Sequence, residues 1–409
     1  MKKGFAFLAL VAATGVAFSQ AKDPAGGVVK IGVSAALSGD AAVYSKPFVN
    51  TVVYMADRFN KEGGILGKKV EVVYYDDKGS PSTALDVVKK LVYDDKVSII
   101  QPGSTSGAIL TAMPVGKKER LIQFGYGLSD DYIKQGEGMI FRAAPTNQVL
   151  LGGLARYAAE ELNLKTIGII HLDSSFGENQ RDVFTSIFQQ YGGKILLSKA
   201  YQEGERDFNA IGSEVVAAKP DGIVIFAQAG SAAAGVKQLA SIMPKTMKLL
   251  GHNEWANPTT RKLAGEAAAR LDAYCSPVAV AINPDPKVQE WVKRIETDMK
   301  TPVVEEMMRG IVGMQIIKIA VEKAGSFDGL KVMREIHKLK DVDTVMGNFS
   351  YDIRDGEAIK DALIVKPNNA DPRGDTVIKR VRSDVALYPT PPNYATYFGA
   401  NYYQEMSAK

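Results

Sequence analysis

Polar and aromatic side chains follow the ends of several predicted strands in this 409-residue chain. Ser38 and Tyr44 come after an apolar run at 29–34, and Ser104 and Thr105 come after another short apolar run. In an open α/β sheet, small ligands bind beyond the carboxyl ends of the strands. Hydroxyl groups, backbone amides and rings at that edge can hold a ligand without reacting with it, so the pattern predicts binding rather than catalysis.

Ser104 and Thr105 stand between a predicted strand and a helix expected to begin near Ala108. Their hydroxyl groups and the nearby backbone N–H groups could converge on a carboxylate, assisted by the positive end of the helix dipole. The alternative is that both residues only cap the helix.

Residues suited to metal binding or nucleophilic catalysis are few. The three histidines, His171, His252 and His337, have no metal-ligand spacing, so we predict no metal and no cofactor. His171 beside Asp173 is the only indication of acid–base chemistry, and the only cysteine, Cys275, has an apolar strand context. No G-x-S-x-G turn or phosphate-binding loop follows a strand. We therefore predict that the protein is not an enzyme, and we keep a hydrolytic enzyme as the weakest alternative.

Predicted strands, polar loops and helices alternate along most of the chain. This order predicts right-handed crossovers and parallel sheets. The helix after the first loop is expected to begin near Pro47, which suits a first turn, with Ser45 as its cap. The alternation stops at 141–146 and restarts as if a second sheet began, and the chain length also favours two domains.

The first twenty residues predict export. Two lysines precede an apolar run at 5–13, and Ala17 and Ser19 offer a cleavage site. We predict that residues 1–20 are a signal peptide, and that its cleavage leaves a soluble periplasmic protein. An uncleaved anchor is the alternative, but the apolar run is shorter than the roughly 20 residues that a membrane span needs.

The charge of the exported chain argues against a nucleic acid partner. Removal of residues 1–19 takes away two lysines and no acid, which lowers the formal net charge from +4 to +2. Such a small excess is no electrostatic footprint for nucleic acid.

Several runs occur in a characteristic order: IGVSAALSG, FNKEGGILGKKVEVVYYDD, DSSFGEN, EGERDFNAIGSEVVAAKPDGIVIF and LLGHNEWANP. Together they resemble the solute-binding proteins of branched-chain amino acid ABC transporters, the leucine/isoleucine/valine-binding group with a type I periplasmic-binding fold. The similarity covers roughly residues 28–366. It implies an α/β fold with two doubly wound parallel-sheet lobes joined by three crossover segments.

The resemblance also implies a domain division and a function. Lobe 1 would combine residues 28–144 and 278–348, lobe 2 would combine 145–277 and 349–385, and a C-terminal tail would follow at 386–409. The lobes would close on a small amino acid-like or carboxylate ligand and deliver it to a membrane ABC permease, and we expect a monomer. An extracellular sensing module for a signalling partner is the alternative with the same fold.

The resemblance assigns roles to residues on both lobes. Tyr44 and Phe176 would place one ring from each lobe against the ligand, although core packing is the alternative for each. The loop with Ser104 and Thr105 would bind the ligand carboxylate.

Three positions depart from the family pattern. Tyr126 stands where amino acid binders usually carry a small residue or threonine, and Gln228 stands where many relatives have tyrosine. Asn253 occupies the position of the usual acid for the ligand ammonium group, with Glu254 next to it. Either Glu254 takes over that task or the ligand has no ammonium group, so an amide, an aromatic acid or another small carboxylate stays open.

Charged residues also begin a long predicted helix near a ligand-facing position of the relatives. For Glu305 and Glu306 the helix dipole supplies a structural explanation, which is the one we favour from sequence. If Arg309 instead faced the ligand, its guanidinium could bind a second carboxylate of the ligand through two hydrogen bonds.

Overall fold

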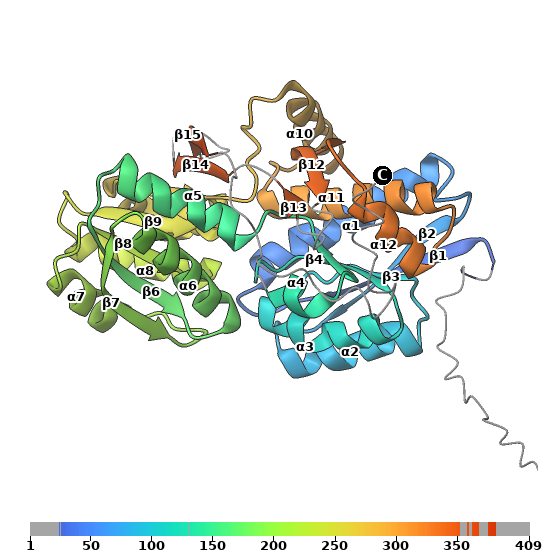
Figure 1. Ribbon diagram of the computed structural model, residues 1–409, viewed down its shortest axis with the longest axis horizontal. Helices are drawn as coiled ribbons and strands as arrows, with labels where there is room; N and C mark the ends of the chain where they lie inside the picture. The colour runs from blue at the N-terminus through green and yellow to red at the C-terminus, as the bar shows by residue number, and fades with distance from the viewer. Residues whose placement is uncertain are drawn as a thin grey trace, which may run out of the picture.

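The computed structural model describes residues 24, 26–129, 131–351, 358–359, 362–367 and 375–381. The predicted signal peptide at 1–20 and the predicted tail at 386–409 lie outside these ranges. Two bodies, each built on its own sheet, lie side by side (Figure 1). We call the body with the five-stranded sheet lobe 1 and the body with the seven-stranded sheet lobe 2.

Lobe 1 is built on parallel strands in the order β2-β1-β3-β4-β5. Helices α2 and α3 cover the face at the bottom of Figure 1, and α1, α11 and α12 pack on the opposite face. In the first part of the chain its elements are β1 (Val28–Ala35), α1 (Ala42–Lys61), β2 (Lys69–Asp76), α2 (Pro81–Tyr93), β3 (Ile99–Ile100), α3 (Ser106–Lys118), β4 (Ile122–Gly125), α4 (Asp131–Gly136) and β5 (Ile140–Arg142). Three more helices come much later in the chain: α10 (Pro286–Met299), α11 (Glu305–Ala324) and α12 (Gly329–His337).

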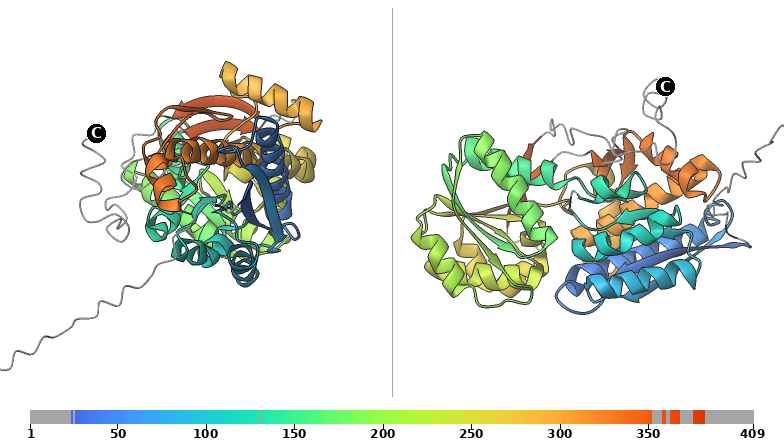
Figure 2. Two further views of the ribbon diagram at one scale, coloured as in Figure 1. Left: turned by 90° about the vertical axis from the view of Figure 1, so that its right-hand side faces the viewer. Right: turned by 60° about the horizontal axis from the view of Figure 1, so that its bottom comes forward.

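Lobe 2 has the strand order β15-β14-β10-β9-β8-β6-β7, in which β14 and β15 are antiparallel and the other strands are parallel. Helices α5 and α6 share one apolar core, and α7 and α8 belong to another. The two pairs of helices cover opposite faces of the sheet (Figure 2). The elements are α5 (Asn147–Glu160), β6 (Thr166–Leu172), α6 (Ser175–Gln190), β7 (Lys194–Tyr201), α7 (Asn209–Ala217), β8 (Gly222–Phe226), α8 (Ala229–Ile242), β9 (Lys248–His252), η1 (Asn253–Trp255), α9 (Pro258–Ala264), η2 (Gly265–Arg270), β10 (Ala273–Ser276), β14 (Ala362–Pro367) and β15 (Asp375–Val381).

The chain passes between the lobes after β5, after β10 and before β14. Strand β12 (Gly347–Tyr351) forms a small antiparallel sheet with β11 (Val342–Thr344) and β13 (Ala358–Ile359). The sequence predicts a return to lobe 2 at residue 349, but Phe349 and Tyr351 still pack in the core of lobe 1. The third crossing therefore lies between β13 and β14 in the structure, because β13 still pairs with β12.

The apolar patterns of the sequence account for these layers. All five residues of β8 are buried, as expected for a parallel strand covered on both faces. In α2, Pro81 stands at the first helical position and Ala84, Val88 and Leu91 recur on the buried side. Cys275 in β10 is likewise buried.

Two predicted helix starts are wrong, and both lie near the candidate site. Helix α1 begins at Ala42 instead of near Pro47, because Tyr44 and Ser45 already bond through their N–H groups to the carbonyl of Ala41. Tyr44 therefore lies in the first turn of a helix rather than in a loop.

Helix α3 begins at Ser106, two residues before the predicted start, because the side chain of Thr105 caps it.

Across the described ranges, no helix is both long and apolar enough to cross a membrane.

Candidate functional site

The predicted aromatic residues of lobe 1 form one buried group. The rings of Tyr44 and Tyr126 stack with centroids 5.7 Å apart and an interplanar angle of 7°. Phe48 contacts Tyr126 edge to face at 5.1 Å, so three rings form a continuous apolar wall. Burial and then the charge of Glu254 raise the pKa of Tyr44, which indicates that Tyr44 of lobe 1 lies near a carboxylate of lobe 2.

The hydroxyl groups proposed to bind a carboxylate already have protein partners. Ser104 Oγ donates to Asp77 Oδ1 at 2.7 Å, and Thr105 Oγ1 donates to the carbonyl of Gly79 at 3.0 Å while it accepts the N–H of Ala108. The alternative role, helix capping, is therefore the one that Thr105 has in this structure. Both hydroxyl protons are used, so a ligand carboxylate at this loop would depend on backbone N–H groups.

Ser38 is also committed to a protein partner. Its hydroxyl donates to Asp76 Oδ2 at 2.7 Å in an exposed position, and this bond, with the N–H groups of Leu37 and Lys78 that also point to Asp76, holds the loop after β1 in place. The geometry gives Ser38 a role in loop structure and offers no free hydroxyl proton for a ligand.

The predicted residues of lobe 2 lie on neighbouring elements. Gln228 occupies the N-cap position of α8, is buried, and its Oε1 has no hydrogen-bond partner within the described residues. Helix α8 packs against η1, which carries Asn253 and Glu254. Phe176 at the start of α6 is half-buried, and its ring meets that of His252 edge to face at 6.4 Å.

The α3–α6 contact brings two further predicted residues to the interface between the lobes. A Cβ atom on Gly107 would lie 3.7 Å from Ser175 Oγ, so the start of α3 in lobe 1 faces the start of α6 in lobe 2. Ser104 and Phe176 therefore lie at one interlobe surface, although their side chains have different neighbours.

A cluster of carboxylates lies where η1 of lobe 2 meets α11 of lobe 1. Asn253 Nδ2 lies 3.2 Å from Glu305 Oε1 and 3.3 Å from Glu254 Oε1, and Asn257 Nδ2 donates to Glu306 Oε1 at 2.8 Å. Glu305 Oε2 also accepts the N–H of Val278, which lies in the second crossing segment after β10. We call the bonds from Asn253 and Asn257 to α11 the buried interlobe contact.

Burial changes the acidity of this cluster. It raises the pKa of Glu305 to about 7, and it raises the pKa values of Glu254 and Glu306, with the neighbouring carboxylates adding to the shift of Glu254. Burial also lowers the pKa of the adjacent His252 to about 3, so its imidazole is neutral at physiological pH. Three carboxyl groups thus share a site in which negative charge is costly.

Arg309 is the basic partner of these carboxylates. It is 1% exposed, its Nη1 lies 3.6 Å from Glu305 Oε1, and its guanidinium carbon lies 3.7 Å from the centroid of the Tyr126 ring. Glu305 and Glu306 lie in the first turn of α11, where the helix dipole favours acids as the structural explanation requires, but this turn is also buried against the other lobe. The Glu–Arg pair at i and i+4 was the available signal, but such pairs usually indicate an exposed helix face.

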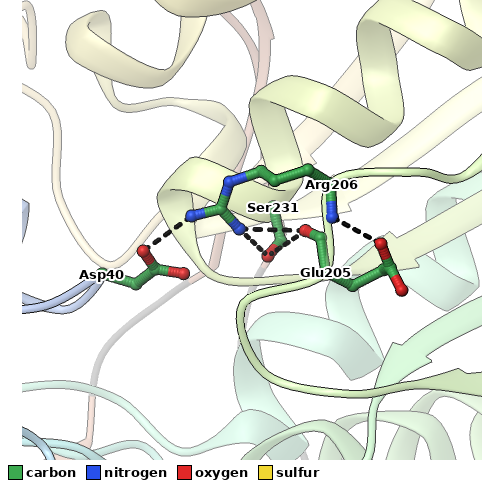
Figure 3. Close-up of polar contacts among 4 residues, drawn as sticks. All are labelled: Asp40, Glu205, Arg206 and Ser231. Atoms are coloured by element: carbon green, nitrogen blue, oxygen red, sulfur yellow. Dashed lines mark hydrogen bonds and ion pairs between the residues drawn. The ribbon is translucent and has the colours of Figure 1, made fainter.

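An exposed ion pair joins the lobes at a second place. Arg206, in the loop after β7, donates through Nη2 to Asp40 Oδ1 at 2.7 Å, and Asp40 lies in the loop after β1 (Figure 3). The other terminal nitrogen of Arg206 donates to Ser231 Oγ and to the carbonyl of Glu205. The side chains of Arg206 and Asp40 are 48% and 25% exposed, and we call their pair the exposed interlobe contact.

The chemistry of this interface is polar recognition. Hydrogen-bonding groups and aromatic rings converge from both lobes, and within the part of the chain that the structure describes no group of three or more His, Cys, Asp or Glu residues has a metal-binding arrangement. The predicted residues that come together are Tyr44, Tyr126, Asn253 and Glu254, with Gln228 on a neighbouring helix.

Comparison with known proteins adds an independent line of information. A protein family described as periplasmic binding protein matches residues 28–372. The leucine-, isoleucine-, valine-, threonine-, and alanine-binding protein of Pseudomonas aeruginosa is 23% identical over 356 residues, which are 86% of this chain and 93% of that protein.

Two solved structures share the fold. A leucine binding protein, LivK, from Thermotoga maritima superposes with a TM-score of 0.80 at 19% identity, covering 87% of this chain and 99% of its own. A solute binding protein of an ABC transporter from Rhodopseudomonas palustris, in complex with 3,4-dihydroxy benzoic acid, gives a TM-score of 0.79 at 20% identity, covering 88% and 98%. These matches confirm the predicted fold class.

Proposed function

Because the chain belongs to the periplasmic binding protein family, we propose that it is the extracytoplasmic solute-binding component of an ABC importer. It captures a small amino acid-like or carboxylate ligand between lobe 1 and lobe 2 and passes it unchanged to a membrane permease. By its name, one relative binds leucine, isoleucine, valine, threonine and alanine, and a protein of the same fold was solved in complex with 3,4-dihydroxy benzoic acid.

One observation carries this proposal: polar atoms from both lobes are buried together without partners. Tyr126 Oη and Glu306 Oε2 of lobe 1 and Gln228 Oε1, Asn253 Oδ1 and Glu254 Oε2 of lobe 2 have no hydrogen-bond partner among the described residues. Buried polar groups are normally satisfied, and each unsatisfied one is costly. A polar ligand enclosed between the lobes would supply the missing bonds, so we assign ligand contacts to these residues and to Tyr44.

The test is a thermal-shift screen of the mature protein against amino acids, amides, aromatic acids and dicarboxylates, followed by calorimetric titration. A ligand at 100 times its dissociation constant stabilises the folded state by about 2.7 kcal/mol, which is an easily measured shift. We expect at least one compound to bind and to be recovered unchanged. Binding of none of them, or conversion of the bound compound to a product, would contradict the proposal.

Export and delivery need separate measurements. We expect cell fractionation to recover the protein from the periplasm with a new N-terminus close to residue 20, and deletion of its gene to reduce uptake of the identified ligand. We also expect the purified protein to be a monomer in light scattering. A protein that stays in the cytoplasm with Met1 intact would contradict the predicted export.

A further inference from the structure

The guanidinium group of Arg309 has one edge without a partner. Its Nη1 is directed to Glu305, and one of its faces lies on the ring of Tyr126. Nε and Nη2, which share the remaining edge, have no hydrogen-bond partner in the described part of the chain. Two parallel N–H groups on one edge of a guanidinium match the two oxygens of a carboxylate.

Carboxyl oxygens without partners lie in the same buried cluster. Glu254 Oε2 and Glu306 Oε2 come from different lobes, and neither has a partner within the described residues. The charge of Arg309 acts on both carboxyl groups, yet no hydrogen bond joins either of them to its open edge. Unpaired donors and unpaired acceptors thus share one site without satisfying each other.

We infer that Arg309 binds the anionic group of the ligand through Nε and Nη2, and that Glu254 and Glu306 accept hydrogen bonds from a donor group of the same molecule. This inference rests on the proposed function and narrows its ligand class to molecules with an anionic group and a hydrogen-bond donating group. A zwitterionic amino acid and a hydroxylated aromatic acid both have this chemistry.

The inference explains two features of the chain. Ser104 and Thr105 have given their hydroxyl protons to protein oxygens, so the anionic group of the ligand needs another donor. Tyr126, which departs from the family pattern, supplies the flat surface on which the guanidinium of Arg309 rests. The bulky phenol is therefore part of the anion site.

The first experiment compares matched probes on the wild-type protein by calorimetry. The probes are L-leucine, 3-methylbutylamine, which lacks the carboxylate, and 4-methylpentanoate, which lacks the ammonium group. The second set is 3,4-dihydroxybenzoate, catechol and benzoate. In each set, the first compound has both an anionic group and a hydrogen-bond donating group, and we call it the bipolar probe. Within one set, we expect the bipolar probe to bind at least about tenfold more tightly than both of its truncated counterparts. Equal affinity within the set that binds would overturn the inference, and no binding in either set or in the wider screen would overturn the proposed function as well.

The second experiment replaces the guanidinium. Arg309→Gln should lower the affinity for the bipolar probe by about 100-fold, because a buried charge pair loses one partner. The same substitution should change the affinity for the probe without the anionic group by less than about threefold. Arg309→Lys keeps the charge but loses the two-pronged geometry, so its effect should be intermediate.

Arg294→Gln on α10 is the matched control, because Arg294 forms its ion pair with Glu290 on the helix surface, outside the interlobe site. We expect it to bind the bipolar probe like the wild type. Full affinity of folded Arg309→Gln, or an equal loss for the probe without the anion, would overturn the inference while leaving the proposed function intact. If Arg309→Gln does not fold, the affinities of Arg309→Lys and of the wild type for the probe series test whether Arg309 binds the anionic group.

Discussion

The two places where the lobes touch differ in solvent exposure. At the buried interlobe contact, amides of Asn253 and Asn257 meet the carboxylates of α11 beside a crossing segment. At the exposed interlobe contact, Asp40 and Arg206 form an ion pair that water and salt can reach. Buried hydrogen bonds to charged groups are costly to lose, whereas exposed ion pairs contribute little to stability. We therefore expect the buried interlobe contact to contribute more than the exposed one to how strongly the lobes hold together.

The largest expected effect comes from removing an amide of the buried interlobe contact. Asn257→Ala leaves Glu306 without the donor that now lies at 2.8 Å. We expect the free energy of unfolding to fall by about 1.5–3 kcal/mol, the range for a hydrogen bond to a charged group. Urea unfolding monitored by circular dichroism measures it, with Asn50→Ala on the exposed side of α1 as the control. A loss no greater than that of the control would remove the contrast between the two contacts.

The pH dependence of stability is the next test. Because the pKa of Glu305 is raised to about 7, and those of Glu254 and Glu306 are also raised, the folded state binds these protons more tightly than the unfolded state. Their contribution to stability is present at low pH and is lost as the pH rises through about 7. We expect the ligand-free protein to lose on the order of 1 kcal/mol through Glu305 between about pH 6.5 and pH 8.

His252 acts in the opposite direction at the lower end of that range, because it is neutral in the folded state, with a pKa of about 3, but partly protonated in the unfolded state, with a pKa of about 6.5. This contribution is common to the wild type and to Glu305→Gln, so it does not affect their comparison. Urea unfolding at several pH values should give a flatter profile for Glu305→Gln than for the wild type. Parallel profiles for the two proteins would show that Glu305 is not protonated in the fold.

A smaller effect is expected at the exposed interlobe contact. Arg206→Gln removes the pair with Asp40, and exposed pairs contribute only about 0.2–1 kcal/mol. We expect ligand dissociation in stopped-flow measurements to become at most about fivefold faster, with almost no change in unfolding. Added salt should speed dissociation from the wild type but not from the variant. A salt response that persists in Arg206→Gln would assign it to other charges.

The smallest effect is expected at Ser38. Its hydroxyl donates to Asp76 in an exposed position, so Ser38→Ala should change ligand affinity by less than about twofold. Calorimetric titration measures this. A tenfold loss would restore Ser38 as a ligand contact and would place a binding surface outside the buried interlobe contact.

The sequence was sufficient for the layers of the fold and for part of the site. Short apolar runs such as that of β8 predicted buried parallel strands, because the apolar pattern there admits few alternatives. The start of α1 was missed since Pro47 suits a first turn but is tolerated here inside the helix. The sequence offered a ligand-facing Arg309 only as an alternative, because the burial of its side chain depends on the packing of α11 against a lobe that is distant in sequence.

The burial of Cys275 inside β10 has a practical consequence for following the lobes. It is the only thiol in the sequence, and a folded sheet shields it from labelling reagents. A fluorophore would therefore attach only to cysteines introduced on the surface, one on each lobe. Energy transfer between two such dyes would record each capture and release of ligand. Cys275 and the other side chains that pack the core would stay unchanged.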